Sequence, residues 1–112
     1  MLTVLVGQIQ QAYANLLDAA GPLKYPTSDE LGCPRITCRF NRFQTGNIYW
    51  SPTPGAHEVH GAIFAEYGRQ GYENSRFRLP TTGEFVVPGG RQVNFQGGWI
   101  KWLSAGNRIV TS

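Results

Sequence analysis

The sequence predicts an α+β fold of two tandem units, each a helix followed by a small antiparallel β-sheet of hairpins, with one shared core. The first observation is an internal repeat, because the pattern F-Q-x-G-x-I-x-W at residues 43–50 returns at residues 95–102. Two more blocks return in the same order: residues 7–13 at 61–67, and residues 25–30 at 79–84. The second observation is that 14 glycines and 7 prolines among 112 residues favour tight turns and short strands. Blocks that recur in order indicate one supersecondary unit present twice.

The first unit is predicted to span residues 7–60 and to begin with a helix over residues 7–20. Apolar residues recur there at the spacing of one helix face: Ile9, Ala12, Tyr13, Leu16, Leu17 and Ala20. Gly21 and Pro22 end the helix. A polar turn follows at residues 26–30. Short strands separated by turn residues are then expected at 40–43, 48–51 and 56–59.

The second unit is predicted to span residues 61–112, within a single domain that covers residues 1–112. A helix over 61–70 and a turn over 80–83 should precede strands at 92–95, 99–103 and 107–110. Residues 1–6 lack the positive region and the length of a signal peptide, so we expect them to begin the folded unit. The residues expected to fill the shared core are Ile9, Tyr13, Leu16, Ile48, Trp50, Ile63, Tyr67, Ile100 and Trp102.

Charge and cysteine content narrow the class of protein. The net charge is +3 and the basic residues are scattered, so no nucleic-acid partner is expected. No stretch approaches the roughly 20 apolar residues of a membrane span. Cys33 and Cys38 indicate either a small disulfide loop, typical of an oxidising compartment, or two reduced thiols in a turn. Two cysteines cannot close a zinc site without further ligands, and no cofactor is expected.

Strand alternation divides the aromatic residues into two groups. The Ile-x-Trp pair at residues 48–50 and its repeat at 100–102 fall on one face, which we predict to be core. Tyr49 and Trp99 fall on the opposite face among polar neighbours. An exposed ring in such surroundings suits a sugar, whose C–H face packs on an aromatic plane. The alternative is that these two rings cover a neighbouring helix.

Polar residues near these rings complete a predicted ligand-binding groove of Tyr49, His57, Trp99, Lys101 and Arg108. A hydrogen bond into the adjacent turn is the competing explanation for His57. The segment His-Glu-Val-His at residues 57–60 is not the metalloprotease pattern H-E-x-x-H, and its two histidines would point to opposite sides of a strand. A three-histidine metal site is excluded because the chain has 2 histidines.

Three blocks carry a resemblance to a known family. Residues 23–30 read L-K-Y-P-T-S-D-E, residues 43–50 read F-Q-T-G-N-I-Y-W and residues 55–63 read G-A-H-E-V-H-G-A-I. Together they resemble the LGFP repeat, a unit of actinobacterial envelope and secreted proteins. Lys24 and Arg78 stand where that repeat has glycine. The resemblance implies that the chain anchors proteins to the cell wall and is secreted or envelope-associated, with any leader outside this chain.

The sequence therefore predicts a non-catalytic module that binds cell-envelope glycan of the peptidoglycan or arabinogalactan type, or tethers a partner domain to it. The alternatives are a small secreted cationic hydrolase acting on glycan or RNA, and a protein–protein interaction module of a secreted complex. A hydrolase would depend on carboxylates such as Glu58, Glu66 or Glu73. Glu30 and Glu84 occupy matching places after a Pro-Thr turn, where we expect them to accept backbone N–H groups.

Overall fold

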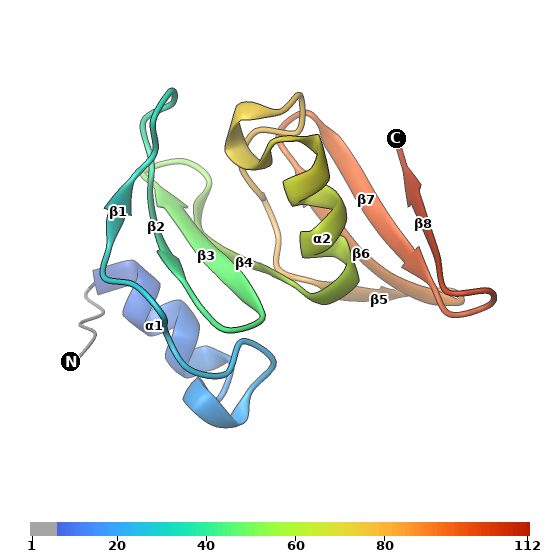
Figure 1. The fold of residues 1–112 in the computed structure, drawn as a ribbon, viewed down its shortest axis with the longest axis horizontal. Helices are drawn as coiled ribbons and strands as arrows, with labels where there is room; N and C mark the ends of the chain where they lie inside the picture. Colours follow the sequence, from blue (N-terminus) through green and yellow to red (C-terminus); the bar gives the residue numbers. More distant parts are fainter. Residues whose placement is uncertain (1–6) are drawn as a thin grey trace.

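The structure, a computed structural model, describes residues 7–112 and contains two helix–sheet units in succession (Figure 1). We name residues 7–60 unit one and residues 61–112 unit two. The elements of unit one are α1 (Gly7–Asn15), the 3-10 helix η1 (Asp18–Ala20), β1 (Leu31–Gly32), β2 (Arg39–Arg42), β3 (Gly46–Ser51) and β4 (Gly55–His60). The elements of unit two are α2 (Gly61–Gln70), the 3-10 helix η2 (Tyr72–Asn74), β5 (Phe85–Val87), β6 (Gly90–Phe95), β7 (Gly98–Leu103) and β8 (Arg108–Thr111). The predicted α+β fold of two tandem units is confirmed, while the expectation for residues 1–6 lies outside the described residues.

Each unit contains one four-stranded antiparallel sheet whose strands are ordered as they occur in the chain. We call β1-β2-β3-β4 sheet one and β5-β6-β7-β8 sheet two. All six predicted strands are present, with ends displaced by one or two residues. The edge strands β1 and β5 were not predicted, because runs of 2 and 3 residues are too short to show an alternating pattern.

The two α-helices differ in how well the sequence predicted them. The bounds of α2 are those expected from the pattern. By contrast, α1 ends at Asn15 rather than at residue 20. Leu17 and Asp18 take positive φ values of 70° and 51°, which a right-handed helix cannot contain. The apolar spacing continued past Asn15, but the backbone turns there.

The repeat extends from the sequence to the backbone. Lys24 and Arg78 both have positive φ, 66° and 60° respectively. The carbonyl of Lys24 accepts a hydrogen bond from the Tyr13 hydroxyl at 2.6 Å, and the carbonyl of Arg78 accepts one from Tyr67. Because positive φ favours glycine, the structure explains why a glycine would suit these two positions.

The two units stack as four alternating layers: α1, sheet one, α2 and sheet two (Figure 1). α1 packs against β3 and β4, on one face of sheet one. α2 packs against β3 and β4 from the other side, and also against β7 and β8 of sheet two. Sheet one is therefore covered on both faces, whereas helix contacts reach sheet two on one face.

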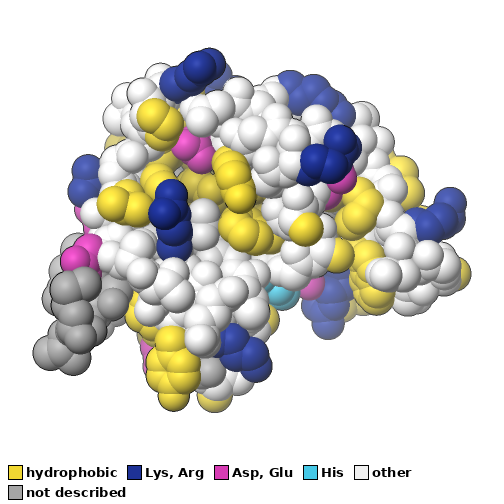
Figure 2. Space-filling model, in the orientation of Figure 1, with side chains coloured by type: hydrophobic (Ala, Val, Ile, Leu, Met, Phe, Trp, Pro, Cys, Tyr) yellow, Lys and Arg dark blue, Asp and Glu magenta, His cyan; other side chains and the backbone are white. Residues whose placement is uncertain are grey.

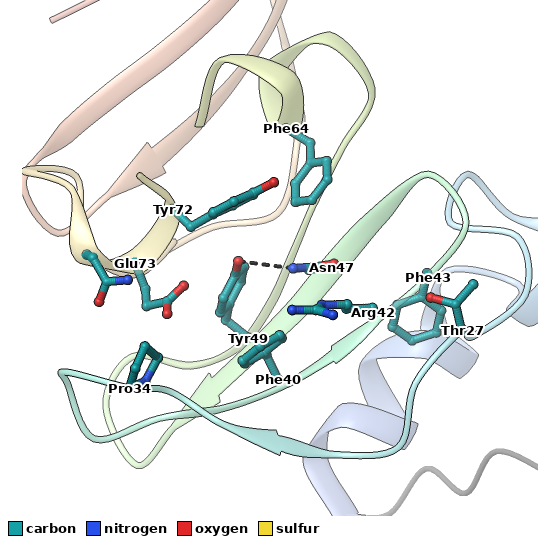
Figure 3. Close-up of a pocket in the computed structure, with 11 residues that line it drawn as sticks. Thr27, Pro34, Phe40, Arg42, Phe43, Asn47, Tyr49, Phe64, Tyr72 and Glu73 are labelled. Atoms are coloured by element: carbon teal, nitrogen blue, oxygen red, sulfur yellow. Dashed lines mark hydrogen bonds between the residues drawn. The ribbon is translucent and has the colours of Figure 1, made fainter. Parts of the chain in front are cut away.

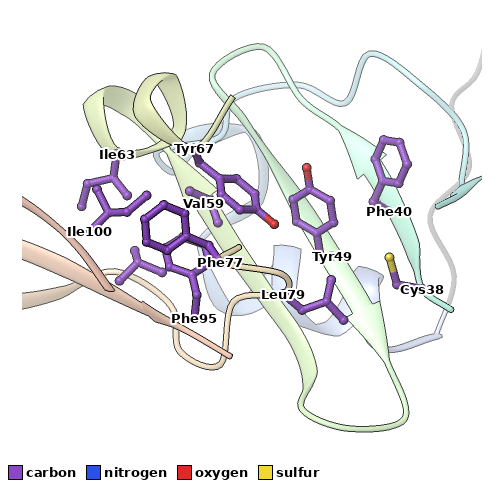
Figure 4. Close-up of a cluster of buried hydrophobic side chains, with 11 residues drawn as sticks. Cys38, Phe40, Tyr49, Val59, Ile63, Tyr67, Phe77, Leu79, Phe95 and Ile100 are labelled. Atoms are coloured by element: carbon purple, nitrogen blue, oxygen red, sulfur yellow. The ribbon is translucent and has the colours of Figure 1, made fainter. Parts of the chain in front are cut away.

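The buried hydrophobic side chains form two clusters instead of the single predicted core. The smaller cluster joins α1 to sheet one and contains Ile9, Tyr13, Leu23, Phe43 and Ile48. The larger cluster joins the two units (Figure 4) and contains Cys38, Phe40, Tyr49, Val59, Ile63, Tyr67, Phe77, Leu79, Val93, Phe95 and Ile100. A core shared between the units exists, but it involves the opposite face of sheet one from the one predicted.

The Ile-x-Trp pair of unit one takes no part in the core that joins the units, whereas in unit two Ile100 belongs to that core and Trp102 borders it. Ile48 lies in the cluster with α1, and Ile100 lies in the cluster with α2, so each isoleucine packs on the helix of its own unit. Trp50 and Trp102 are only partly buried at the edges of these clusters, as is Leu16. Their predicted place inside the core is therefore wrong.

Candidate functional site

A cleft of about 450 Å³ lies between sheet one and the α2–η2 segment of unit two. Figure 3 shows the residues that line it: Thr27, Pro34, Phe40, Arg42, Phe43, Asn47, Tyr49, Phe64, Tyr72, Glu73 and Asn74. Figure 2 views this side of the molecule and shows hydrophobic side chains exposed between basic and acidic ones. The volume falls within the range of roughly 300–1,000 Å³ that is typical of ligand pockets.

Sheet one supplies one wall of the cleft. Phe40 and Tyr49 are directly paired across β2 and β3, and their rings stack with centroids 5.5 Å apart. Asn47 lies two residues before Tyr49 on the same face, and its side-chain amide donates to the Tyr49 hydroxyl oxygen at 3.1 Å. That hydrogen bond leaves the hydroxyl proton of Tyr49 available to an acceptor in the cleft.

The surroundings of Tyr49 favour further the neutral form that a tyrosine hydroxyl already has near pH 7. Tyr49 is 2% exposed. Burial raises the pKa of Tyr49, the amide of Asn47 opposes that increase, and the negative charge of Glu73 adds to it. Tyr49 therefore acts as a hydrogen-bond donor near neutral pH and cannot serve as an anionic base or nucleophile.

The α2–η2 segment supplies the opposite wall. Phe64 on α2 and Tyr72 on η2 place their ring centroids 5.6 Å apart. Gly71, the residue that follows α2, has φ 118°, and Tyr72 after it has φ 56°. This reversal of the backbone turns η2 toward sheet one, and it brings Glu73 into the cleft (Figure 3).

Glu73 is the most unusual group in the cleft. The residue is only 5% exposed. Its carboxylate has no hydrogen-bond or ion-pair partner among residues 7–112, although its charge reaches the hydroxyls of Tyr49 and Tyr67. A buried carboxylate is costly unless other groups compensate it. Glu73 is thus positioned to accept hydrogen bonds from a bound molecule.

Arg42 brings a positive charge to the same cleft. It follows Asn41 on β2, and its guanidinium lies 5.7 Å from the centroid of the Phe40 ring. No carboxylate pairs with this guanidinium within the described part of the chain. The cleft therefore presents one unpaired carboxylate, one unpaired guanidinium and five aromatic rings.

The structure corrects the predicted role of Tyr49. It was expected to be exposed, but it packs edge to face against Tyr67 with ring centroids 5.7 Å apart. The alternative stated above, that the ring covers a neighbouring helix, is the one observed. His57 lies opposite Tyr49 on β4, and its Nε2 is 3.1 Å from the carbonyl oxygen of Pro54, which confirms the expected hydrogen bond into the turn.

The other three predicted binding residues lie on sheet two, away from Tyr49. Trp99 and Lys101 are on the face of β7 opposite Ile100, which is buried toward α2. The Lys101 ammonium is 5.0 Å from the centroid of the Trp99 ring. The predicted groove therefore consists of two separate sites, because α2 and sheet two lie between Tyr49 and Trp99.

In the sequence, Gly-Asn-Arg at residues 106–108 aligns with Gly-Ala-His at residues 55–57, which would match Arg108 to His57; the strand register corrects that match. Leu103 pairs with Arg108 as Ser51 pairs with Gly55, so Arg108 is the counterpart of Gly55. The counterpart of His57 is Val110, which pairs with Lys101. The turn after β7 is one residue longer than the turn after β3, and that insertion displaces the following strand.

The carboxylates proposed as turn stabilisers act differently from the prediction. Glu30 pairs with Arg39, whose Nε is 2.8 Å away. Glu84 does not cap its turn; its backbone N–H instead donates to the Glu58 carboxylate at 2.8 Å. The prediction was right that a carboxylate binds backbone N–H at this turn, but the carboxylate belongs to unit one.

A second hollow of about 360 Å³ surrounds the start of α2 and is lined in part by His60, Glu84, Arg91 and Trp102. Glu84 lies 3.8 Å from His60 and 3.6 Å from Arg91. Glu84 of unit two thus contacts His60 of unit one, so we regard the cluster as a link between the units. Across residues 7–112, no group of three or more His, Cys, Asp or Glu residues is placed to hold a metal ion.

Sequence reasoning missed most of the cleft. Glu73 was considered only as a catalytic carboxylate, and Phe40, Arg42, Phe64 and Tyr72 were not considered. One signal was available, since Phe64 and Tyr72 stand where the first copy has Gln10 and Asp18. Aromatic residues that appear in only one copy of a repeat mark a surface that differs between the copies.

Two stacked helix–sheet units with closely similar backbones make this chain a repeat protein. The family model of the LGFP repeat matches residues 23–75, so this segment of the chain is an LGFP repeat. The matched segment runs from Leu23 through sheet one, α2 and η2, and it contains every residue that lines the cleft. A search of curated proteins gives no match. None of the helices within residues 7–112 is long and apolar enough to cross a membrane.

Proposed function

We propose that this protein is a non-catalytic binding module of the cell envelope and that the cleft between the units holds a segment of cell-wall glycan. The observation that carries the proposal is the unpartnered Glu73 carboxylate, 5% exposed, in a cleft that lies inside one family repeat. All residues that line the cleft lie in the segment 23–75 matched by the family model, although this segment spans parts of both units. The secreted or envelope location is part of the proposal, and the Cys33–Cys38 disulfide fits an oxidising compartment.

The chemistry of the cleft suits sugar rings. Phe64 and Tyr72 provide the accessible aromatic surface of the cleft, and the nearly buried Phe40 and Tyr49 line the opposite wall. Sugar C–H faces pack on such rings. Sugar hydroxyls can donate hydrogen bonds to the Glu73 carboxylate, which has no other hydrogen-bond partner among residues 7–112.

The groups in the cleft favour binding over hydrolysis. A glycosidase needs two carboxyl groups on either side of the scissile bond. Glu73 is the one carboxylate among the described residues that line the cleft. Tyr49 is held neutral, and neither histidine lines the cleft. These features support a module whose affinity per site is modest and which gains avidity when several copies act together.

The test compares two isosteric variants in binding to purified peptidoglycan, arabinogalactan and simple sugars. Glu73→Gln removes the charge in the cleft, and Glu66→Gln removes a charge on the same helix–turn segment that pairs with Arg69 outside it. Because a charged hydrogen bond contributes about 1.5–3 kcal/mol, Glu73→Gln should weaken binding by about tenfold or more. Glu66→Gln should bind as the wild type does.

The same pair of variants separates the competing functions. Equal binding by both variants would show that the cleft is not the site. Loss of a measurable glycan or RNA turnover in Glu73→Gln would favour the hydrolase instead. Tyr49→Ala is unsuitable as a binding test because Tyr49 is buried, so Phe64→Ala on the accessible wall is the better second variant.

A further inference from the structure

Units one and two contact each other through a single interface within residues 7–112. On unit two we call the side with Phe64, Tyr72 and Leu79 the leading surface. It covers the face of sheet one that carries Tyr49, which we call the trailing face of that sheet. Leu79 is 4% exposed in the cluster that joins the units (Figure 4).

The trailing face of sheet two has the same position in its own unit, and in residues 7–112 no other layer covers it. β5 to β8 pack on each other and on α2, which lies against the opposite face. Strand pairing places five partly exposed apolar residues on this open face: Phe85, Val87, Trp99, Leu103 and Val110. A small protein seldom leaves that much contiguous apolar surface without a partner.

Among residues 7–112, no further layer covers the corresponding leading surface of unit one either. Tyr25 is the counterpart of Leu79 in the repeated block, and it is 64% exposed where Leu79 is buried. Leu17, at the end of α1, is 71% exposed. Figure 2 shows hydrophobic side chains at the lower edge of the molecule, where α1 and η1 lie in Figure 1. The stack of layers thus ends in an apolar surface on each side: the leading surface of unit one and the trailing face of sheet two.

Charges on the two open surfaces are also complementary. In the existing interface, Tyr49 lies close enough to Tyr72 for that residue to raise its pKa. The counterpart of Tyr49 is Lys101, and the counterpart of Tyr72 is Asp18, which shares its positive φ. Stacking in the same geometry would therefore set the Lys101 ammonium against the Asp18 carboxylate. Neither has an ion-pair partner within the chain segment that the structure describes.

We infer that the trailing face of sheet two binds the leading surface of unit one from a second copy of this chain. The contact repeats the geometry between units one and two, with Leu103 against Tyr25 and Lys101 against Asp18. Such a contact is heterologous, because the two surfaces differ, and it continues from copy to copy instead of closing at a dimer. The inference uses surfaces outside the cleft and does not depend on the proposed glycan binding.

Sedimentation equilibrium of the whole chain tests this over protein concentrations from about 10 µM to about 1 mM. The weight-average mass should rise from the 12.4 kDa of one chain past the mass of a dimer, and less steeply in high salt. Trp99→Ser with Lys101→Glu should hold the protein as a monomer. Asp18→Asn with Tyr25→Lys should do the same from the other surface. An equimolar mixture of the two double variants should form a one-to-one heterodimer, because each retains the surface that the other lacks.

Matched controls keep the result specific. Val86→Ser changes an exposed apolar residue on the other side of sheet two, and Glu73→Gln changes the cleft, so both should associate as the wild type does. A wild type that stays monomeric throughout overturns the inference, as does a mixture that forms no heterodimer. Loss of wall binding by Trp99→Ser with Lys101→Glu at monomer concentrations would assign the face to a ligand and also overturn it.

Discussion

Units one and two share a framework and differ in what covers them. In both, a tyrosine hydroxyl binds a carbonyl at a positive-φ residue, and a threonine N–H binds the strand opposite, Thr27 at 2.7 Å and Thr81 at 2.8 Å. On the trailing faces, however, Tyr49 is buried whereas its counterpart Lys101 is partly exposed. Equivalent backbone positions in the two units therefore hold different side chains, because another layer covers one position and leaves the other exposed.

The comparison also explains why one complete cleft is present. Its sheet wall belongs to unit one and its helix wall to unit two, so a cleft needs a sheet followed by the helix of the next unit. Sheet two could supply the sheet wall of a second cleft, with Trp99 and Lys101 in the places of Asn47 and Tyr49. The number of complete clefts is therefore set by how many units stack, which connects fold to avidity.

The largest expected difference between the units is the response to truncation on the trailing face. Tyr49→Ala should lower the free energy of unfolding by about 3–5 kcal/mol, because it opens a cavity in the core that joins the units. Lys101→Ala should change it by about 0.5 kcal/mol or less. Urea unfolding followed by tryptophan fluorescence measures both. Equal losses in the two variants would show that sheet two is covered in solution as sheet one is.

The second expected difference concerns the disulfide, which unit two lacks. Cys33 and Cys38 are bridged, with a sequence separation of 5, and they close the β1–β2 hairpin beside the larger core. A loop of this size should stabilise the fold by about 2 kcal/mol. Changing both cysteines to alanine should therefore lower the free energy of unfolding by about that amount.

Reductant provides the control for the disulfide. It should destabilise the wild type by about 2 kcal/mol and leave the double alanine variant unchanged, as measured by thermal unfolding. If the wild type unfolds at the same temperature with and without reductant, the bridge does not stabilise the native protein.

Features that depend on neighbouring residues in the chain were predictable. The bounds of α2 follow from its apolar spacing and from Gly71, and the spacing of Cys33 and Cys38 allowed the disulfide that forms without deciding between it and two free thiols. The repeat itself predicted two similar units. Each of these is set by local periodicity or by short-range geometry.

The two faces of sheet one show what the sequence could not decide. Alternation separates Ile48 and Trp50 from Tyr49 but does not say which layer packs on each side. Asn47 and Ser51 made the face of Tyr49 look solvent-exposed, yet both are buried beneath unit two. Stacking of whole layers determined that outcome, and a single strand pattern does not contain it.

The candidate site was missed for related reasons. Glu73 reaches the cleft because Gly71 and Tyr72 reverse the chain and because α2 packs on sheet one. Neither condition can be inferred from the seven carboxylates of the sequence taken one by one. For Arg108, the longer hairpin moved the strand position by two residues, so Arg108 stays on the face of Lys101 but pairs with Leu103 instead.

A smaller effect is expected where the two units are alike. Lys24 and Arg78 both hold positive φ, a conformation that costs a side chain about 1–2 kcal/mol and glycine very little. After allowance for the greater freedom of glycine in the unfolded chain, Lys24→Gly and Arg78→Gly should each stabilise the protein by about 0.5–1 kcal/mol. Guanidinium unfolding midpoints measure the gain.

Alanine at the same positions isolates the backbone contribution. Lys24→Ala removes the long side chain but keeps a Cβ at positive φ, so it should bring no comparable gain. A stabilisation by alanine as large as that by glycine would attribute the effect to the lysine side chain instead of to φ. Unequal gains at positions 24 and 78 would show that the two turns are strained differently despite their similar φ values.

The smallest expected effect is a pH dependence of the link between the units at Glu84. Burial raises the pKa of the Glu84 carboxyl above its ordinary 4.5, nearby Glu58 adds to this, and His60 and Arg91 oppose it. Because the folded-state pKa is the higher one, the folded protein holds this proton more tightly than the unfolded chain does. The contribution of Glu84 to stability is therefore greatest below the ordinary pKa and falls as pH rises through the raised one.

Glu84→Gln should remove this component of the pH dependence and make the protein more stable than the wild type at neutral pH. Glu30→Gln, the matching change in unit one, should retain the Glu84 component because it leaves the link between the units intact. Urea unfolding between about pH 4 and pH 8 compares the three proteins. A Glu84→Gln variant that is less stable than the wild type at neutral pH would mean that attraction to His60 and Arg91 outweighs burial, and the link would then be an ion pair that holds unit two against unit one.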